Sequence, residues 1–223
     1  MNEIGFANWI RQQVADGRVS SCVDLPYLGG GQGEGLRSLP HEIGLLNNLQ
    51  RLYLCGNELT SLPAEVGRLC KLEHINLGFN KLTALPAEIG NLSNLALLHV
   101  YRNRLTALPP EIGHLSRLLQ LNVADNELIS VAPEIGKLCH LEILNLRNNR
   151  LTKLPAEIGN LRNLKRLYIE GNPLTTLPTE LAGLCGLTEL HIDASLVWNA
   201  PPGLRRLPNT VTVVLHGNPF LSK

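Results

Sequence analysis

Leucines recur along the chain at a fixed spacing that is longer than the period of any helix or strand. Seven segments each begin with a framework leucine, and each begins 23 residues after the one before. These leucines are Leu49, Leu72, Leu95, Leu118, Leu141, Leu164 and Leu187. Self-similarity at a period of roughly 20 to 50 residues is typical of a solenoid, in which each unit packs only on its neighbours. The pattern therefore predicts one continuous array of repeats, a single domain overall.

Each unit divides into two halves with different patterns. The unit from Leu141 to Asn163 reads LEILNLRNNRLTKLPAEIGNLRN and follows LxxLxLxxNxL in its first half. Alternation in that half predicts a strand whose leucines point inward and whose variable residues face solvent. The second half, LPAEIG, has a proline that suits a first helical position and a glutamate that complements the helix dipole. A short helical turn is therefore expected opposite each strand. The prolines at this position are Pro63, Pro86, Pro109, Pro155 and Pro178.

An asparagine recurs where each predicted strand ends. A short amide side chain both donates and accepts hydrogen bonds, so it can satisfy backbone groups that are buried between coils without a sheet partner. We expect this framework role for Asn57, Asn80, Asn103, Asn126, Asn149 and Asn172.

The N-terminal part departs from the repeat. Residues 1–19 are expected to form a capping helix with Phe6, Ile10 and Val14 on one face, and Trp9 completes the cap; residues 20–223 form the solenoid. The first strand is predicted at Val23 to Leu25. The glycine-rich stretch from Leu28 to Gly35 then adds six residues. It contains neither GxGxxG nor GxxxxGK, so we interpret it as a surface insertion and not as a phosphate loop.

The C-terminal part departs from the repeat pattern. Ser195 replaces the framework asparagine, and APPGLRRL stands where other units have LPAEIGNL. A partial unit from Thr210 keeps Val213, Leu215, Asn218 and Phe220 on framework positions, which brings the expected number of strands to about nine. The β-branched run TVTVVL would leave one sheet edge unpaired, so homo-association through this edge is one hypothesis.

Composition narrows the class of partner and the cell compartment. The net charge is +1 and the basic residues are scattered, which argues against nucleic acid. No signal peptide and no stretch long and apolar enough for a membrane span can be recognised. Cys70, Cys139 and Cys185 share one repeat position; even Cys139 and Cys185 should lie roughly 10 Å apart, beyond disulfide reach. Free thiols favour a cytoplasmic location, while export by a route without a signal peptide stays open.

The pattern LxxLxLxxNxLxxLPxEIGxLxx at 23 residues resembles a known family. It is similar to the leucine-rich repeats of intracellular Ras-group proteins, with their plant relatives and the Roco proteins, and of many bacterial repeat proteins and secreted effectors. The resemblance implies an α/β solenoid of horseshoe shape, with a parallel sheet on the concave face and short helical turns on the convex face, used for protein binding. Ala132 in place of a proline, Ser195 and the glycine-rich insertion depart from this pattern.

The variable positions of the strands supply the candidate binding residues. Tyrosine and arginine are enriched at interface hot spots, and this chain is otherwise poor in aromatic residues, which make up 4%. The alternative is that tyrosines merely favour strands. The predicted partner-binding residues form a centre, Phe79, His99, Tyr101 and Arg102, with Tyr53, His74, Arg147 and Tyr168 around it.

No catalytic, cofactor or metal site is expected. His74 and His99 should lie about 8 Å apart without a further ligand, and the repeated glutamates lie at helix starts without a base or nucleophile beside them. The sequence therefore favours a non-enzymatic module that binds a protein partner on the concave face. Two alternatives remain: the targeting part of a secreted effector or signalling protein whose enzymatic domain lies elsewhere, and a structural, self-associating repeat protein.

Overall fold

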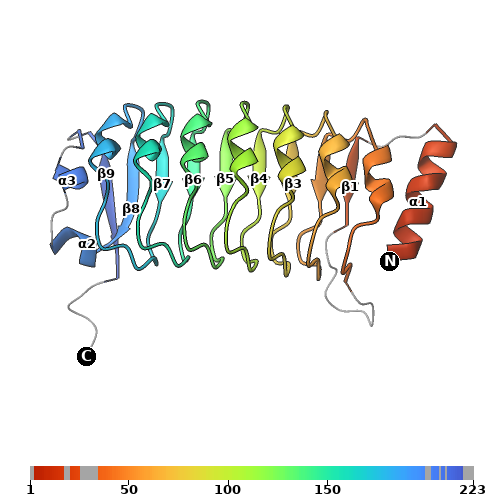
Figure 1. The fold of residues 1–223 in the computed structure, drawn as a ribbon, viewed down its shortest axis with the longest axis horizontal. Coiled ribbons are helices and arrows are strands. Elements are labelled where there is room, and N and C mark those ends of the chain that lie inside the picture. The colour runs from red at the N-terminus through yellow and green to blue at the C-terminus, as the bar shows by residue number, and fades with distance from the viewer. Residues whose placement is uncertain are drawn as a thin grey trace.

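The computed structural model describes residues 3–17, 21–25, 35–198, 202–205, 207–208 and 210–217. Within them, nine strands form one open, parallel sheet in chain order, which confirms the expected solenoid. Figure 1 shows the coils stacked along one axis, with the N-terminal helix at one end. The strands are β1 (Cys22–Asp24), β2 (Arg51–Tyr53), β3 (His74–Asn76), β4 (Leu97–His99), β5 (Gln120–Asn122), β6 (Ile143–Asn145), β7 (Arg166–Tyr168), β8 (Glu189–Asp193) and β9 (Thr212–His216).

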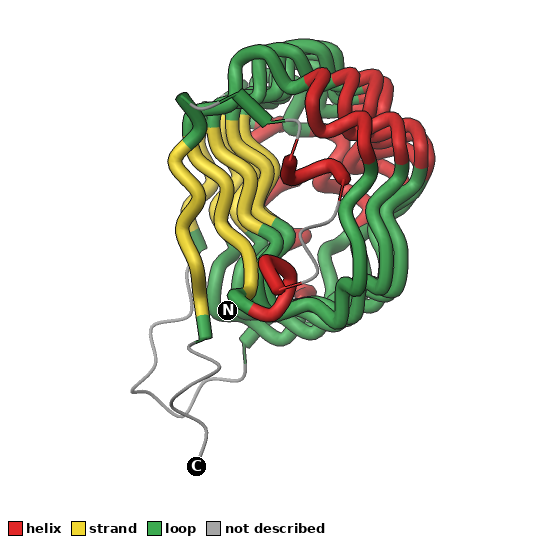
Figure 2. Tube along the Cα trace, turned by 90° about the vertical axis from the view of Figure 1, so that its left-hand side faces the viewer, coloured by secondary structure: helices red, strands yellow, loops and turns green. Residues whose placement is uncertain are grey.

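Short 3-10 turns line the side of the solenoid opposite the sheet (Figure 2). They are η1 (His41–Leu45), η2 (Ala64–Arg68), η3 (Ala87–Asn91), η4 (Pro110–His114), η5 (Pro133–Lys137), η6 (Ala156–Asn160) and η7 (Thr179–Gly183). The expected helical turns are therefore present. The prolines, however, lie one residue earlier than predicted: Pro86 has an extended ψ of 150° and is the N-cap of η3, and helical backbone begins at Ala87. We call the solvent-facing side of the sheet the concave face and the opposite side the convex face.

The strands pair in a constant register. Arg51 lies beside His74, and His74 beside Leu97, so each pairing joins residues 23 apart. The pairing of β1 with β2 is the exception, because Cys22 lies beside Arg51, six residues further along than the period requires. The first strand thus begins at Cys22, one residue before the predicted Val23. The glycine-rich insertion, apart from Gly35, lies outside the described residues.

The inward leucines form one core that runs the length of the array. Leu98, Leu105 and Leu118 are fully buried, as are their equivalents in neighbouring coils. The convex side is packed as closely: a Cβ added to Gly90 of η3 would lie 2.5 Å from the Glu111 carbonyl oxygen of the next turn. Only glycine permits this approach, which explains why LPAEIG ends in glycine in repeat after repeat.

The framework asparagines bridge neighbouring coils as expected. The Asn126 amide nitrogen donates to the carbonyl oxygens of Val100, Val123 and Ala124, at 3.0, 3.1 and 3.1 Å. Its side-chain oxygen accepts the Leu105 N–H at 3.0 Å. The same arrangement recurs at Asn80, Asn103, Asn149 and Asn172. Each asparagine therefore ties the turn of its own coil to the coil before it.

Helix α1 (Glu3–Ala15) covers the first coil. Phe6 and Ile10 are fully buried, and Trp9 stacks on Phe6 with ring centroids 5.7 Å apart. Val14 differs from the prediction, because it is 38% exposed. A 13-residue α-helix is about 20 Å long, whereas the five-residue turn η1 beneath it spans only about 10 Å, so the last turn of α1 overhangs the coil.

The C-terminal end replaces the repeat geometry with two helical turns, α2 (Ser195–Trp198) and α3 (Pro202–Arg205). In the described part of the chain β9 pairs only with β8. Val213 and Leu215 take the inward positions but are 37% and 52% exposed, because no described coil covers them. The predicted framework residues Asn218 and Phe220 lie outside the described residues.

Two further features concern the chain as a whole. No helix in the described ranges combines the length and apolar character needed to cross a bilayer. Cys22, Cys55, Cys70, Cys139 and Cys185 are all free thiols.

Candidate functional site: the concave face

Alternation along the strands places the variable side chains on the concave face. In β2 and the residues after it, Leu52 and Leu54 are buried, while Arg51 is exposed and Tyr53 and Cys55 are partly exposed. Exposure at the last of these alternating positions differs between units: Ala124 and Glu170 are 3% and 7% exposed, whereas the Arg147 side chain is 44% exposed. The predicted surface therefore exists, but not every residue on it can reach a partner.

The position just before each framework asparagine has a left-handed backbone. Gly56 and Gly171 occupy it at φ of 74° and 70°, as expected for glycine. Phe79 and Arg102 adopt nearly the same φ, 53° and 52°, and so do Asp125 and Asn148. A side chain in this conformation costs about 1–2 kcal/mol relative to the right-handed region. Asp and Asn tolerate this conformation, so the strain lies at Phe79 and Arg102, where the flanking units have glycine, aspartate or asparagine.

The two strained residues, Phe79 and Arg102, belong to an exposed aromatic and cationic cluster. Phe79 is 45% exposed and meets the Tyr101 ring edge to face, with centroids 5.4 Å apart. The Arg102 guanidinium lies over the Phe79 ring, 4.7 Å from its centroid, in cation–π geometry. Three of the four predicted central residues are therefore in contact, whereas His99 is not part of this cluster.

Gly78 in the neighbouring coil leaves the space that the Tyr101 ring occupies. A Cβ added to Gly78 would lie 2.6 Å from the Tyr101 ring, so the ring lies flat across this position. The Tyr101 hydroxyl reaches to 3.8 Å from Cys55 Sγ, two coils away. Burial, together with the Cys55 thiol, raises the pKa of Tyr101, so the phenol stays protonated at neutral pH. Gly78 is not among the predicted site residues; the signal for it in the sequence is a glycine 23 residues before Tyr101, at the same position of the preceding repeat.

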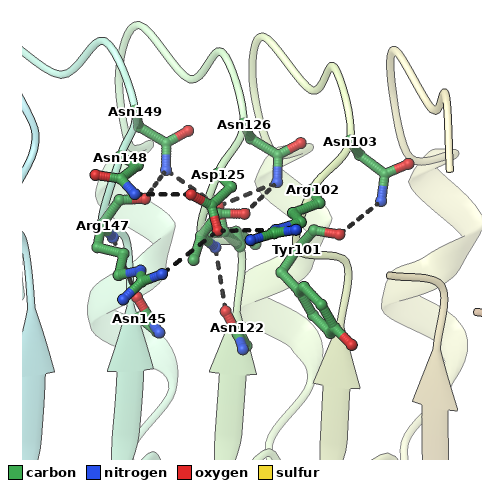
Figure 3. A network of polar contacts seen from close by, with 12 residues as sticks. Tyr101, Arg102, Asn103, Asn122, Asp125, Asn126, Asn145, Arg147, Asn148 and Asn149 are labelled. Atoms are coloured by element: carbon green, nitrogen blue, oxygen red, sulfur yellow. Dashed lines mark hydrogen bonds and ion pairs between the residues drawn. The ribbon is translucent and has the colours of Figure 1, made fainter. Parts of the chain in front are cut away.

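Asp125 links two arginines on the other side of the cluster (Figure 3). Its Oδ2 lies 3.7 Å from Arg102 Nε and 3.8 Å from Arg147 Nη2, and its Oδ1 accepts a hydrogen bond from Asn148 Nδ2 at 2.7 Å. Both guanidinium contacts are longer than a hydrogen bond, and the arginine side chains are 55% and 44% exposed. Two cations therefore share one carboxylate, which leaves a local excess of positive charge.

A shallow hollow lies between these side chains, with a volume of about 210 Å³. Its base includes Asn122 and Asn145, whose Oδ1 atoms accept the N–H groups of Ala124 and Arg147 at 3.1 Å. Their Nδ2 groups are therefore the donors left over, and neither has a partner among the described residues. With Arg147 beside them, the hollow presents hydrogen-bond donors and an apolar rim, and is suited to a group that carries oxygen acceptors.

The other predicted residues lie around this centre or apart from it. Tyr53 Oη lies 3.4 Å from His74 Nδ1, which makes a separate pair. Burial lowers the pKa of His99, and His74 nearby lowers it further, although the hydrogen bond with Gln120 opposes the shift. His99 is thus neutral at pH 7. Tyr168 packs on His191, with ring centroids 4.3 Å apart, at the C-terminal end of the sheet.

Three acidic residues follow or lie in the last strands of the concave face: Glu170, Glu189 and Asp193. Glu170 is buried, and Asp193 Oδ2 accepts the N–H of Gly171 at 2.8 Å. Glu189 is 42% exposed in its side chain and lies beside His191. Most of these carboxylates are therefore buried or in contact with groups of the protein itself.

The fold and its repeats agree with comparisons to known proteins. A leucine-rich repeat model matches residues 47–105, and a leucine-rich repeat region model matches residues 130–210. The chain is a leucine-rich repeat protein. No curated protein sequence matches it significantly.

Three solved structures illustrate the similarity. A leucine-rich repeat protein of Leptospira interrogans is 41% identical, with a TM-score of 0.70, over 83% of this chain and 48% of that one. The plant peptide hormone receptor RGFR1, in complex with RGF2, is 30% identical (TM-score 0.66) over 77% of this chain and 28% of that one. The ectodomain of the Arabidopsis thaliana receptor kinase GASSHO1/SCHENGEN3, in complex with Casparian strip integrity factor 2, is 32% identical (TM-score 0.66) over 72% and 20%. The chain thus spans about half the length of the bacterial protein and less of the plant receptors.

Proposed function

We propose that this protein is a non-enzymatic recognition module that binds a partner protein on its concave face, centred on Phe79, Tyr101, Arg102 and Arg147. One observation carries the proposal: two exposed side chains, Phe79 and Arg102, are held in left-handed backbone, where Gly56 and Gly171 stand in two other units. Strain of this kind persists where the surrounding structure holds it and is concentrated at functional sites. The two plant receptors above, solved with bound ligands, support a binding role for the same fold.

The chemistry of the cluster defines the complementary group. Phe79 offers an apolar surface, while Arg102 and Arg147 compete for the single carboxylate of Asp125. A carboxylate of a partner would supply a second anion, so that each arginine could pair with its own carboxylate. A bidentate pair between a guanidinium and a carboxylate is among the strongest of these hydrogen bonds. The preferred partner segment therefore carries Asp or Glu directly beside an apolar residue.

The test exploits the glycines of the flanking repeats. In the double variant Phe79→Gly, Arg102→Gly, release of about 1–2 kcal/mol of strain per residue offsets the lost cation–π contact and the extra chain entropy of glycine, each roughly 0.5–1 kcal/mol. The unfolding midpoint should therefore stay nearly unchanged while binding is lost. Arg68→Ala, which removes an exposed cation from η2 on the convex face, is the matched control.

Binding is measured by selecting a displayed library of random peptides on the immobilised protein, and by affinity capture from the native cell. Peptides enriched on the wild type and on Arg68→Ala should pair an acidic with an apolar residue and should not be retained by the double variant. Equal retention by the double variant would show that the partner uses another surface.

A further inference from the structure

Three potential metal ligands converge at the C-terminal end of the concave face. They come from three successive coils: Glu170 follows β7, His191 lies in β8 and His216 ends β9. One ligand atom from each lies within 4.8 Å of the others. The residues are 21 and 25 positions apart in the sequence, so no local spacing motif reveals them.

The glutamate of this group lacks a partner that its burial requires. Glu170 is 7% exposed, and its Oε2 is buried without a hydrogen-bond partner among the described residues. A buried carboxylate oxygen without a donor or cation beside it is strongly unfavourable. Positive charge beside this oxygen would therefore stabilise the buried carboxylate.

The two histidines lie with a nitrogen of each ring close together, and contacts on both sides hold the His191 ring. His191 Nδ1 lies 2.9 Å from His216 Nε2, and the His191 ring is packed between Tyr168 and the His216 ring, at centroid distances of 4.3 and 5.2 Å. The opposite nitrogen, His191 Nε2, lies 3.7 Å from a carboxylate oxygen of Glu189. This separation is longer than a hydrogen bond, but it places a carboxylate beside the nitrogen through which such groups usually orient a metal-binding histidine.

We propose that Glu170, His191 and His216 bind a divalent transition-metal ion of the zinc class. Two imidazole nitrogens and one carboxylate oxygen are borderline ligands that suit Zn²⁺, whereas Mg²⁺ and Ca²⁺ prefer oxygen alone. Bonds of about 2.0–2.1 Å in tetrahedral geometry separate ligand atoms by roughly 3.3 Å, so the histidine nitrogens must move slightly apart and the carboxylate must move closer by up to about 1.5 Å. Rotation of side chains covers both adjustments. A fourth position stays open to water or to a group of a partner.

The proposal does not depend on protein binding at the Phe79 cluster. The two sites share the concave face but no residue, since the first lies on coils β3 to β6 and the second on β7 to β9. Loss of metal binding and loss of peptide binding can therefore be observed separately.

Titration of the metal-free protein with Zn²⁺, followed by calorimetry, tests the site. The wild type should bind one equivalent that Glu170→Gln and His216→Gln each bind at least about 100-fold more weakly. His114→Gln is the matched control, because it removes an exposed histidine from η4 on the convex face and should leave the affinity unchanged. If Glu170→Gln does not fold, His216→Gln, at the end of the last described strand, carries the test alone.

Co²⁺ in place of Zn²⁺ distinguishes this site from the five free thiols, which could also bind a soft metal. The proposed site should give visible d–d bands without thiolate-to-cobalt charge-transfer absorption, and His216→Gln should abolish the bands. A wild type that binds no metal, or variants that bind it equally well, would overturn the proposal and leave a hydrogen-bonded histidine pair beside a buried carboxylate.

Discussion

Replacement of one framework asparagine tests whether the amide ladder holds the coils together. In Asn126→Leu, the Leu105 N–H loses its acceptor and has no other among the described residues. The three carbonyl oxygens that accept hydrogen bonds from Asn126 each keep another donor. Ala124 still accepts the Arg102 N–H at 2.9 Å. The main consequence is thus one buried, unsatisfied backbone donor.

The remaining two carbonyls keep donors from the neighbouring rungs. The Val100 oxygen also accepts Asn103 Nδ2, and the Val123 oxygen also accepts Asn149 Nδ2, both at 3.0 Å. A single unsatisfied buried donor costs about 1–3 kcal/mol. For an array of this length, a loss of 2 kcal/mol corresponds to a decrease in Tm of about 4–8 °C. We expect Asn126→Leu to fall in this range.

Urea-induced and thermal unfolding measure the loss, and amide hydrogen exchange locates it. The Leu105 amide should exchange faster in the variant, while the amides of distant coils keep their relative protection. Asn91→Leu is the control, because this exposed asparagine ends η3 at a position held by Arg68, His114 and Lys137 in other turns. An unchanged midpoint for Asn126→Leu, or an equal loss in both variants, would refute the role assigned to the ladder.

Two further outcomes follow from the concave face. Gly78→Ala places a Cβ 2.6 Å from the Tyr101 ring, so the ring must move; we expect peptide binding to weaken and stability to fall by about 1–3 kcal/mol, whereas Ala124→Gly at the equivalent position should leave binding intact. Because the folded state holds the pKa of His99 below its ordinary value near 6.5, the unfolded chain takes up a proton first as the pH falls. The stability contributed by neutral His99 is present above about pH 6.5 and is lost as the pH falls through the folded pKa. Denaturation at several pH values should therefore show a weaker acid dependence in His99→Gln than in the wild type, and identical slopes would contradict this assignment.

The sequence by itself determined the architecture. The 23-residue period, the inward leucines and the framework asparagines predict nine coils, the parallel sheet and the division into two faces, because each of these depends only on which residues repeat. The same alternation placed Phe79, Tyr101 and Arg102 on the exposed side. It could not show that Tyr101 lies across Gly78, since that contact joins residues of different coils.

Only the tertiary structure decided which variable residues act together. Stacking brings side chains from adjacent coils to within about 5 Å, so contacts depend on side-chain reach and backbone conformation and not on the period. Hence Arg102 and Arg147 meet at Asp125, Glu170 is buried although alternation placed it on the surface, and Tyr168 belongs to the His191 group instead of the central cluster. The framework residues repeat and can therefore be recognised in the sequence. The groups proposed to bind a partner or a metal combine side chains from different repeats, and their distances are known only once the coils are packed.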